Sequence, residues 1–96
     1  MSEYITEVSG TNSLENIQLA IAGEEATGAE FIYSRISLHE GTITNLVTFK
    51  DLPPGERPSS RLRFIKQGEV PPDGKTSVWE GVMLVAGTNE ALVAYR

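Results

Sequence analysis

Hydrophobic and polar residues alternate along two stretches of this chain, residues 31–38 and residues 77–85. In each stretch every second residue falls on the same side, and this period of two is typical of β-strands. Each stretch ends at a pair whose second member is glycine, Glu40-Gly41 and Ala86-Gly87. Glycine readily adopts the positive φ that a tight two-residue turn requires. The pattern therefore predicts two β-hairpins.

The two hairpins coincide when the chain is shifted against itself by 46 residues, so that 32–50 lies over 78–96. The identical pairs are Leu38 and Leu84, Gly41 and Gly87, Thr42 and Thr88, Leu46 and Leu92, and Val47 and Val93. A shared spacing of this kind indicates an internal repeat. We place it at 13–50 and 59–96, with a proline-rich connector at 51–58. Chance similarity is the alternative, because hairpins share turn glycines and β-branched residues.

Residues 13–22 fit two kinds of element. The apolar residues of this segment include Leu14, Ile17, Leu19 and Ile21. Ile17, Leu19 and Ile21 have the spacing of a strand. Leu14, Ile17 and Ile21 have instead the spacing of a helix, which would begin behind an N-cap at Asn12 or Ser13. We favour a strand, because the repeat aligns this segment with the strand that the pattern predicts at 61–66.

These elements predict one all-β domain spanning residues 1–96. Residues 4–8 add a further short strand, so the total is six to seven antiparallel strands. We expect a small barrel or sandwich built from two related β-meander halves, with a short helix near 13–22 as the alternative to a strand there.

The stretch 68–77, GEVPPDGKTS, contains a Gly-Lys-Thr that invites comparison with a phosphate-binding loop. Such a loop has four residues between its first glycine and the Gly-Lys, and a helix follows it. Here Gly68 and Gly74 enclose five residues, two of them prolines, and the next residues alternate like a strand. We therefore predict a turn at 71–74 that joins two strands.

The composition is that of a soluble globular protein, with 40% hydrophobic and 22% charged residues and no cysteine. The absence of cysteine excludes disulfides and thiolate sites, and it fits a cytoplasmic location. The net charge of −5 disfavours nucleic acid as a partner, and no apolar run long enough for a membrane span is present. Residues 1–48 carry one basic and seven acidic side chains, and residues 49–96 carry seven basic and six acidic ones. This asymmetry fits scattered surface charge or, alternatively, complementary surfaces for self-association or for a protein partner.

The sequence offers little catalytic chemistry. His39, the single histidine, falls at a predicted turn, and Glu24-Glu25 are expected to be solvated charges in a loop. A triad or a metal site needs several convergent groups. We therefore expect neither an enzyme nor a metal site, and we expect no cofactor.

Arginines and aromatic residues are the candidates for binding. Arg57 and Arg61 have the Arg-x-x-x-Arg spacing that resembles the phosphate clamp of PilZ domains, which bind cyclic dinucleotides, but the second PilZ element, Asp/Asn-x-Ser-x-x-Gly, is missing. No family is therefore assigned. The remaining interface or ligand candidates are Arg63, Tyr33, Trp79, Phe49 and Tyr95, of which the aromatic residues form two equivalent pairs in the repeat. Tyr33 and Trp79 fit either a core or an exposed apolar patch.

Two functions follow as hypotheses. The first is a non-enzymatic binding or assembly protein of the accessory or inhibitor type, a homo-oligomer that acts through protein–protein contacts at the Tyr33/Trp79 face. The second is a β-barrel that holds a small apolar or anionic molecule, in its mouth or between subunits, with Arg57, Arg61 and Tyr33 as contacts.

Overall fold

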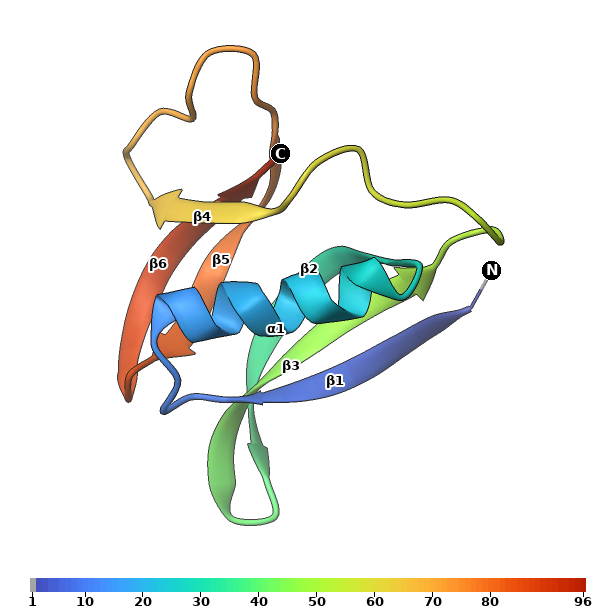
Figure 1. Ribbon diagram of the computed structural model, residues 1–96. Coiled ribbons are helices and arrows are strands. Elements are labelled where there is room, and N and C mark those ends of the chain that lie inside the picture. The colour runs from blue at the N-terminus through green and yellow to red at the C-terminus, as the bar shows by residue number, and fades with distance from the viewer. Residues whose placement is uncertain (1) are drawn as a thin grey trace.

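Six strands and one helix follow one another along the computed structural model (Figure 1). The structure describes residues 2–96, apart from the side chain of His39, so the predicted turn histidine lies outside the described residues. The elements are β1 (Glu3–Ser9), α1 (Leu14–Ala26), β2 (Ala29–His39), β3 (Thr42–Asp51), β4 (Arg63–Lys66), β5 (Ser77–Val85) and β6 (Thr88–Tyr95). The strands form two antiparallel sheets, ordered β1-β3-β2 and β4-β6-β5. The predicted fold class is confirmed as an open sandwich with one helix.

The two predicted hairpins, β2-β3 and β5-β6, are present and share their local geometry. Their turns have positive φ at both central positions, 50° and 78° at Glu40 and Gly41, and 51° and 81° at Ala86 and Gly87. Such turns match the twist of the strands that they join. Each first arm also contains one irregularity in register, between Phe31 and Tyr33 in β2 and at the corresponding place in β5.

The third strand of each sheet differs from the expected meander. In a meander, consecutive strands are neighbours, but here β3 and β6 lie in the centre, because β1 and β4 pair with the second arm of each hairpin. Tyr4 of β1 lies opposite Phe49, and Arg63 of β4 lies opposite Tyr95, the residue that the 46-residue shift aligns with Phe49. The strand that corresponds to β4 in position is therefore β1.

The prediction of a strand at 13–22 was wrong, because this segment lies within helix α1. The Ser13 hydroxyl caps the helix by accepting a hydrogen bond from the amide of Asn16 at 3.2 Å. Ile17 and Ile21 fall on one side of the helix, and both are buried. The helical spacing decides the structure of this segment, because α1 packs its apolar face on the core. The two three-stranded sheets are built from other segments of the chain.

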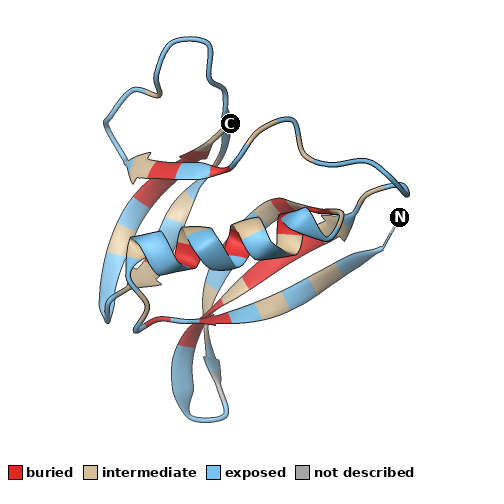
Figure 2. Cartoon of the chain, viewed as in Figure 1, coloured by how far each residue is buried: buried red, intermediate tan, exposed pale blue. Residues whose placement is uncertain are grey.

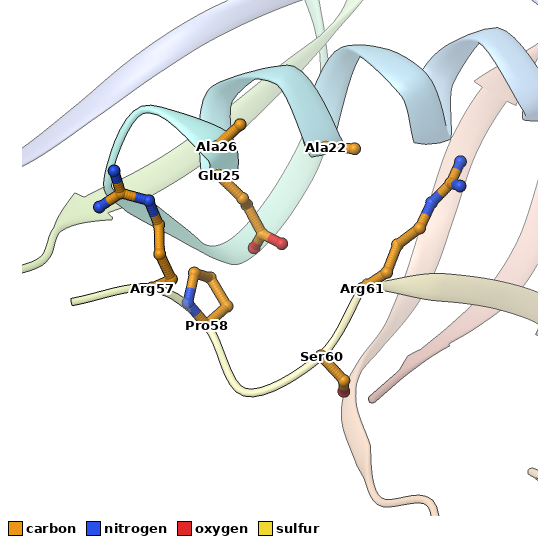
Figure 3. Close-up of a pocket in the computed structure, with 7 residues that line it drawn as sticks. All are labelled: Ala22, Glu25, Ala26, Arg57, Pro58, Ser60 and Arg61. Atoms are coloured by element: carbon orange, nitrogen blue, oxygen red, sulfur yellow. The ribbon is translucent and has the colours of Figure 1, made fainter. Parts of the chain in front are cut away.

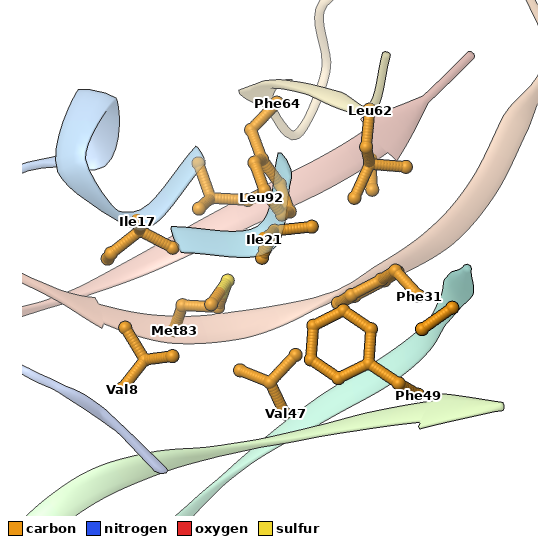
Figure 4. Close-up of a cluster of buried hydrophobic side chains, with 12 residues drawn as sticks. Val8, Ile17, Ile21, Phe31, Val47, Phe49, Leu62, Phe64, Met83 and Leu92 are labelled. Carbon is orange, nitrogen blue, oxygen red and sulfur yellow. The ribbon is translucent and has the colours of Figure 1, made fainter. Parts of the chain in front are cut away.

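Helix α1 and the two sheets enclose the core (Figures 1 and 4). Phe31 lies at its centre, with ring centroids 6.4 Å from Phe49, 6.1 Å from Phe64 and 5.7 Å from Trp79, each in an edge-to-face arrangement. Edge-to-face packing is a favoured geometry for aromatic rings. Because these partners come from β3, β4 and β5, one aromatic ring of β2 contacts both sheets. The colouring by burial shows the same interior from α1 to β3 and β6 (Figure 2).

Asn45 of β3 joins the two sheets where β2 and β5 lie near each other. Its side-chain Nδ2 donates to the carbonyl oxygen of Leu84 at 2.9 Å, and its Oδ1 accepts from the Leu84 amide at 2.9 Å. The amide of Asn45, which is fully buried, thus satisfies both main-chain groups of Leu84 as a neighbouring strand would. This pairing fixes β5 against the first sheet.

Strand β4 lies at the edge of its sheet, and side chains cover its free main-chain groups. The amide of Phe64 donates to Oε1 of Gln18 at 3.0 Å, and the amide of Lys66 donates to Oε1 of Glu69 at 2.8 Å. An unpaired strand edge is a template for pairing with another chain. These two side chains close the edge of β4 to such pairing.

The loop that contains Gly-Lys-Thr is a connection between β4 and β5, as predicted. The Lys75 amide donates to the carbonyl oxygen of Pro72 at 3.1 Å, which closes a turn. Thr76 then exchanges two main-chain hydrogen bonds of 2.9 Å with Arg96. Strand β5 follows directly, and the absence of a helix at this point removes the element that would face a phosphate.

Candidate functional site

An open cleft of about 310 Å³ lies between the second half of α1 and the connector that leads to β4 (Figure 3). Its lining residues are Ala22, Glu25, Ala26, Arg57, Pro58, Ser60 and Arg61. The helix contributes small apolar side chains, and the connector contributes both arginines of the Arg-x-x-x-Arg spacing. The cleft therefore combines an apolar floor with two cationic groups.

The segment that joins β3 to β4 is fixed to the rest of the fold at three points. The Leu52 amide donates to the carbonyl oxygen of Gly28 at 2.8 Å, just after the helix ends. The Ser60 carbonyl oxygen accepts from Nη1 of Arg96 at 2.5 Å, and the side chain of Leu62 is 2% exposed in the core. Because both ends of the connector are fixed, the segment that carries Arg57 and Arg61 has a defined path.

A buried ion pair lies beneath the cleft, between Glu25 of α1 and Arg96. Both guanidinium nitrogens of Arg96 donate to the carboxylate of Glu25, which also accepts from the Phe31 amide at 2.8 Å. Glu25 is 6% exposed, so the prediction that it is a solvated loop charge was wrong. A buried carboxylate requires a cation and hydrogen-bond donors, and this site supplies both.

Glu24, the neighbour of Glu25, lies on another side of α1 and contacts β1. Its Oε1 accepts from the Tyr4 hydroxyl at 3.1 Å and from the Thr6 hydroxyl at 3.4 Å. Burial, together with this hydrogen bond and the charges of Glu24 and Asp51, raises the pKa of Tyr4 to about 12. The two carboxylates therefore act separately, and they do not form a catalytic pair.

The charges at the cleft are unbalanced toward positive. Arg96 neutralises Glu25, whereas Arg57 and Arg61 form no ion pair with any described carboxylate. Nη1 of Arg57 donates to the carbonyl oxygen of Glu56 at 2.8 Å, which orients its side chain. In Figure 3 the two arginines lie on either side of Glu25. The arrangement suits an anionic group, because arginine forms strong charge-assisted hydrogen bonds with carboxylates and phosphates.

The apolar part of the cleft limits what accompanies the anion. Ala22 and Ala26 are one helical turn apart, and Pro58 faces them from the connector (Figure 3). These side chains offer contact to a short aliphatic group but no hydrogen bonds. The best fit is an anion that carries a small apolar portion.

Tyr33 and Trp79 lie in different environments, although the 46-residue shift aligns them. Tyr33 is 39% exposed and lies opposite Thr48 in the first sheet, whereas Trp79 is half-buried and packs on Phe31. The two sheets turn opposite faces to the core. The main core cluster contains Val47 and Phe49 of β3 but Leu92 and Ala94 of β6, which is one position out of step with the 46-residue shift. Trp79 thus packs against the core, whereas Tyr33 lies at the surface.

The other candidates lie in separate environments. Phe49 is fully buried in the core, where it supports the fold and is inaccessible to a partner. Arg63 is exposed and lies opposite the half-buried Tyr95 on paired strands, away from the residues that line the cleft. Among the predicted site residues, only Arg57 and Arg61 share one cleft.

The residues of the cleft region that were missed from the sequence are Ala22, Glu25, Ala26, Pro58, Ser60 and Arg96. Alanine carries no chemical signal, so the floor becomes visible only once α1 is recognised as a helix. Glu25 lies four and eight residues after Ile21 and Ile17, so a helical pattern would have placed its carboxylate on the buried face. That position was a signal for a buried partner of opposite charge.

Other kinds of site are not found in the described part of the chain. No group of three or more histidine, cysteine, aspartate or glutamate residues there has the arrangement of a metal site. No helix among the described residues is long and apolar enough to cross a membrane, since α1 has 13 residues.

Comparisons with protein-family models, with curated proteins and with solved structures gave no match. No relative therefore suggests a ligand or an activity. The function is inferred below from the geometry and charge of the cleft beside α1.

Proposed function

We propose that this chain is a non-enzymatic binding and assembly protein that recognises carboxylate groups on a protein surface through the cleft beside α1. The contact surface is the cleft lined by Arg57, Arg61, Ala22 and Ala26 rather than a Tyr33/Trp79 face. Glutamate and aspartate side chains match the two guanidinium groups, and the aliphatic part of such a side chain matches the alanine floor.

One observation carries this proposal: two arginines without a carboxylate partner flank an apolar floor. Arginine side chains are enriched at protein interfaces, where they act as anchors when they become desolvated. The overall charge of −5 does not oppose this role, because Glu25 beneath the cleft is already neutralised by Arg96. The local charge, rather than the net charge, attracts the partner.

The cleft contains no set of groups for catalysis. Ser60 is the single hydroxyl among its lining residues, and no histidine lines it. The Glu25 carboxylate is held by Arg96 and by the Phe31 amide, so its oxygens are not available as a base. These features support a binding role.

The test uses a fluorescein-labelled helical peptide of alanine and glutamate, measured by fluorescence anisotropy against the whole chain. We expect Arg57→Ala/Arg61→Ala to weaken binding at least about tenfold, because each charge-assisted hydrogen bond contributes about 1.5–3 kcal/mol. The same peptide with glutamine in place of glutamate serves as the ligand control.

Arg63→Ala/Lys66→Ala is the matched protein control, because it removes the same charge from β4 without touching the cleft. Equal losses in the two double variants would mean that net charge alone governs binding. That outcome, or tight binding of the glutamine peptide, would refute the proposal.

A small anionic molecule is a second candidate, favoured by the size of the cleft. Its volume of about 310 Å³ lies near the lower end for small-molecule sites, which span about 300–1,000 Å³. Butyrate and inorganic phosphate are suitable probes, and the Nε–H resonances of the arginines report their binding by NMR. Saturable shifts at Arg57 and Arg61 below about 1 mM ligand, without binding of the acidic peptide, would favour this second function.

A further inference from the structure

The outer face of α1 carries little charge for a surface helix. Its exposed residues include Leu19, which is 52% exposed, and the small residues Ala20, Gly23 and Ala26. Space around Gly23 is open, since a Cβ atom there would meet no atom within 4 Å. A helix that faces only water normally carries polar residues on its outer side. This face is therefore suited to a contact with another protein surface.

The exposed face and the cleft are continuous along one side of the helix. Glu15, Leu19, Ala22 and Ala26 are spaced by four, three and four residues, so they lie in one row along α1. The end of this row at Ala22 and Ala26 is the floor of the cleft between Arg57 and Arg61. The other end is Glu15, whose exposed side chain forms no hydrogen bond or ion pair with another described residue.

The two ends of this row are complementary in charge and in shape. A carboxylate stands at the first turn of α1, and the unpaired guanidinium group of Arg57 lies beyond its last turn, near Gly28. When two such helices pack in antiparallel directions about a twofold axis, the first turn of each meets the last turn of the other. With the axis between Ala20 and Gly23, Glu15 of each copy reaches the level of Arg57 in the second copy.

We propose that the occupant of this cleft is a second copy of the same chain, in a twofold dimer with antiparallel α1 helices. The inference rests on the proposed function, since it names the partner that supplies the carboxylate. Leu19 of each copy fills the apolar floor at Ala22 and Ala26 of the other. Glu15 of each copy pairs with Arg57 of the other, Arg61 adds positive charge on the far side of the cleft, and symmetry makes every contact twice.

The shape of the molecule provides the area that such a dimer needs. The chain extends over 37 × 32 × 18 Å, so it is a thin slab, and α1 crosses the front of both sheets in Figure 1. A stable interface buries about 800 Å² on each partner. The broad face exceeds this area, and Ala20 and Gly23 allow the two helices to approach closely.

Dimerisation through strand edges fits this molecule less well. The edge of β4 is covered by Gln18 and Glu69, as described above. Antiparallel pairing of β1 with itself, centred on Ile5, would place Glu3 of one copy opposite Glu7 of the other, and like charges in opposite positions are destabilising. The helix face is therefore the surface that favours a symmetric partner.

Charge reversal tests the pairing, with sedimentation equilibrium as the measurement and the whole chain as the sample. We expect the native chain to dimerise, and both Glu15→Arg and Arg57→Glu/Arg61→Glu to raise the dimer dissociation constant at least about tenfold, because like charges then face each other. The chain that carries all three reversals should regain dimerisation to within about threefold of the native chain. Circular dichroism confirms that each variant is folded.

Glu3→Arg and Arg63→Glu are the controls, because they reverse exposed charges that belong neither to α1 nor to the lining of the cleft, and they should leave the dimer unchanged. A native chain that stays monomeric up to millimolar concentration would overturn the inference, as would a dimer that is insensitive to the cleft reversals. Failure of the triple variant to regain dimerisation would also refute it.

The failure of this inference can be separated from failure of the proposed function. A monomeric chain that still binds the glutamate peptide through Arg57 and Arg61 would keep the function and remove only the second copy as the partner. A monomeric chain that binds butyrate or phosphate but not the glutamate peptide would refute both the dimer and the recognition of protein carboxylates, and it would favour the small-molecule function. A dimer that is broken by the reversals supports both proposals.

Discussion

The ion pair between Glu25 and Arg96 is the interaction whose loss should destabilise this fold most. We predict that Arg96→Met lowers the free energy of unfolding by about 3–5 kcal/mol, the cost of removing one partner of a buried ion pair. Methionine retains a flexible apolar stem, but it leaves the carboxylate of Glu25, which is 6% exposed, without a cation. It also leaves the carbonyl oxygen of Ser60 without its donor.

Urea unfolding followed by tryptophan emission measures this effect. Trp79 is the single tryptophan, and its ring lies 5.7 Å from that of Phe31, so its emission reports on the core. A domain of this size has a total stability of about 5–14 kcal/mol, so the predicted loss is a large fraction of the total. With the usual dependence on urea, the midpoint should fall by at least about 1 M.

Lys50→Met is the matched control for this prediction. It removes a lysine that pairs with Glu30 at 3.3 Å, but both side chains are about one-third exposed, so the loss should be below about 1 kcal/mol. The double variant Glu25→Gln/Arg96→Met should recover part of the stability. The side chain introduced at position 25 is uncharged, and its carbonyl oxygen can still accept from the main-chain amide of Phe31. Equal losses for Arg96→Met and Lys50→Met would refute the argument from burial.

Three further predictions test other parts of the fold. Gly81→Val should destabilise the protein by about 1–3 kcal/mol and shift the emission of Trp79, because a Cβ atom at Gly81 would clash with the indole ring of Trp79. The contribution of Tyr4 to stability should be complete below about pH 10 and lost as the pH rises to about 12, because the pKa of Tyr4 is higher in the folded than in the unfolded chain. The Tyr4→Phe variant should not show this loss of stability between about pH 10 and 12. Asn45→Ala should lower the free energy of unfolding by about 2–4 kcal/mol and speed hydrogen exchange of the Leu84 amide. Protection of this amide equal to that in the native chain would contradict the prediction.

The hairpins were predictable because their signals are local. A glycine at the second turn position and alternating residues on either side specify a tight turn between two strands, and Gly41 and Gly87 both adopt positive φ. The six strands of the structure include both predicted hairpins, and the segments 4–8 and 61–66 contribute β1 and β4. Local spacing was sufficient for these elements.

Helix α1 and the facing of the aromatic residues were not predictable in the same way. Isoleucines at positions 17 and 21 fit a strand and a helix equally, and the aligned repeat favoured the wrong element. The repeat also made Tyr33 and Trp79 equivalent, whereas their sheets present opposite faces to α1. Which face becomes the interior depends on how the two sheets meet, and this is a tertiary property that no local spacing records.

The candidate site was predictable only in its arginines. Their spacing of four residues drew attention to Arg57 and Arg61, and they do line one cleft. The alanines that form its floor and the Glu25–Arg96 pair beneath it depend on a helix that local spacing did not distinguish from a strand. A binding surface made partly of small residues becomes visible only in three dimensions.

The covered edge of β4 has a consequence for how this protein behaves at high concentration. Open-ended growth by strand pairing requires two free edges on each molecule, one to receive a neighbour and one to offer to the next. Gln18 and Glu69 occupy the edge of β4, so the sheet β4-β6-β5 cannot grow past this strand. We therefore expect strand-paired fibres to form slowly in concentrated solutions of this protein.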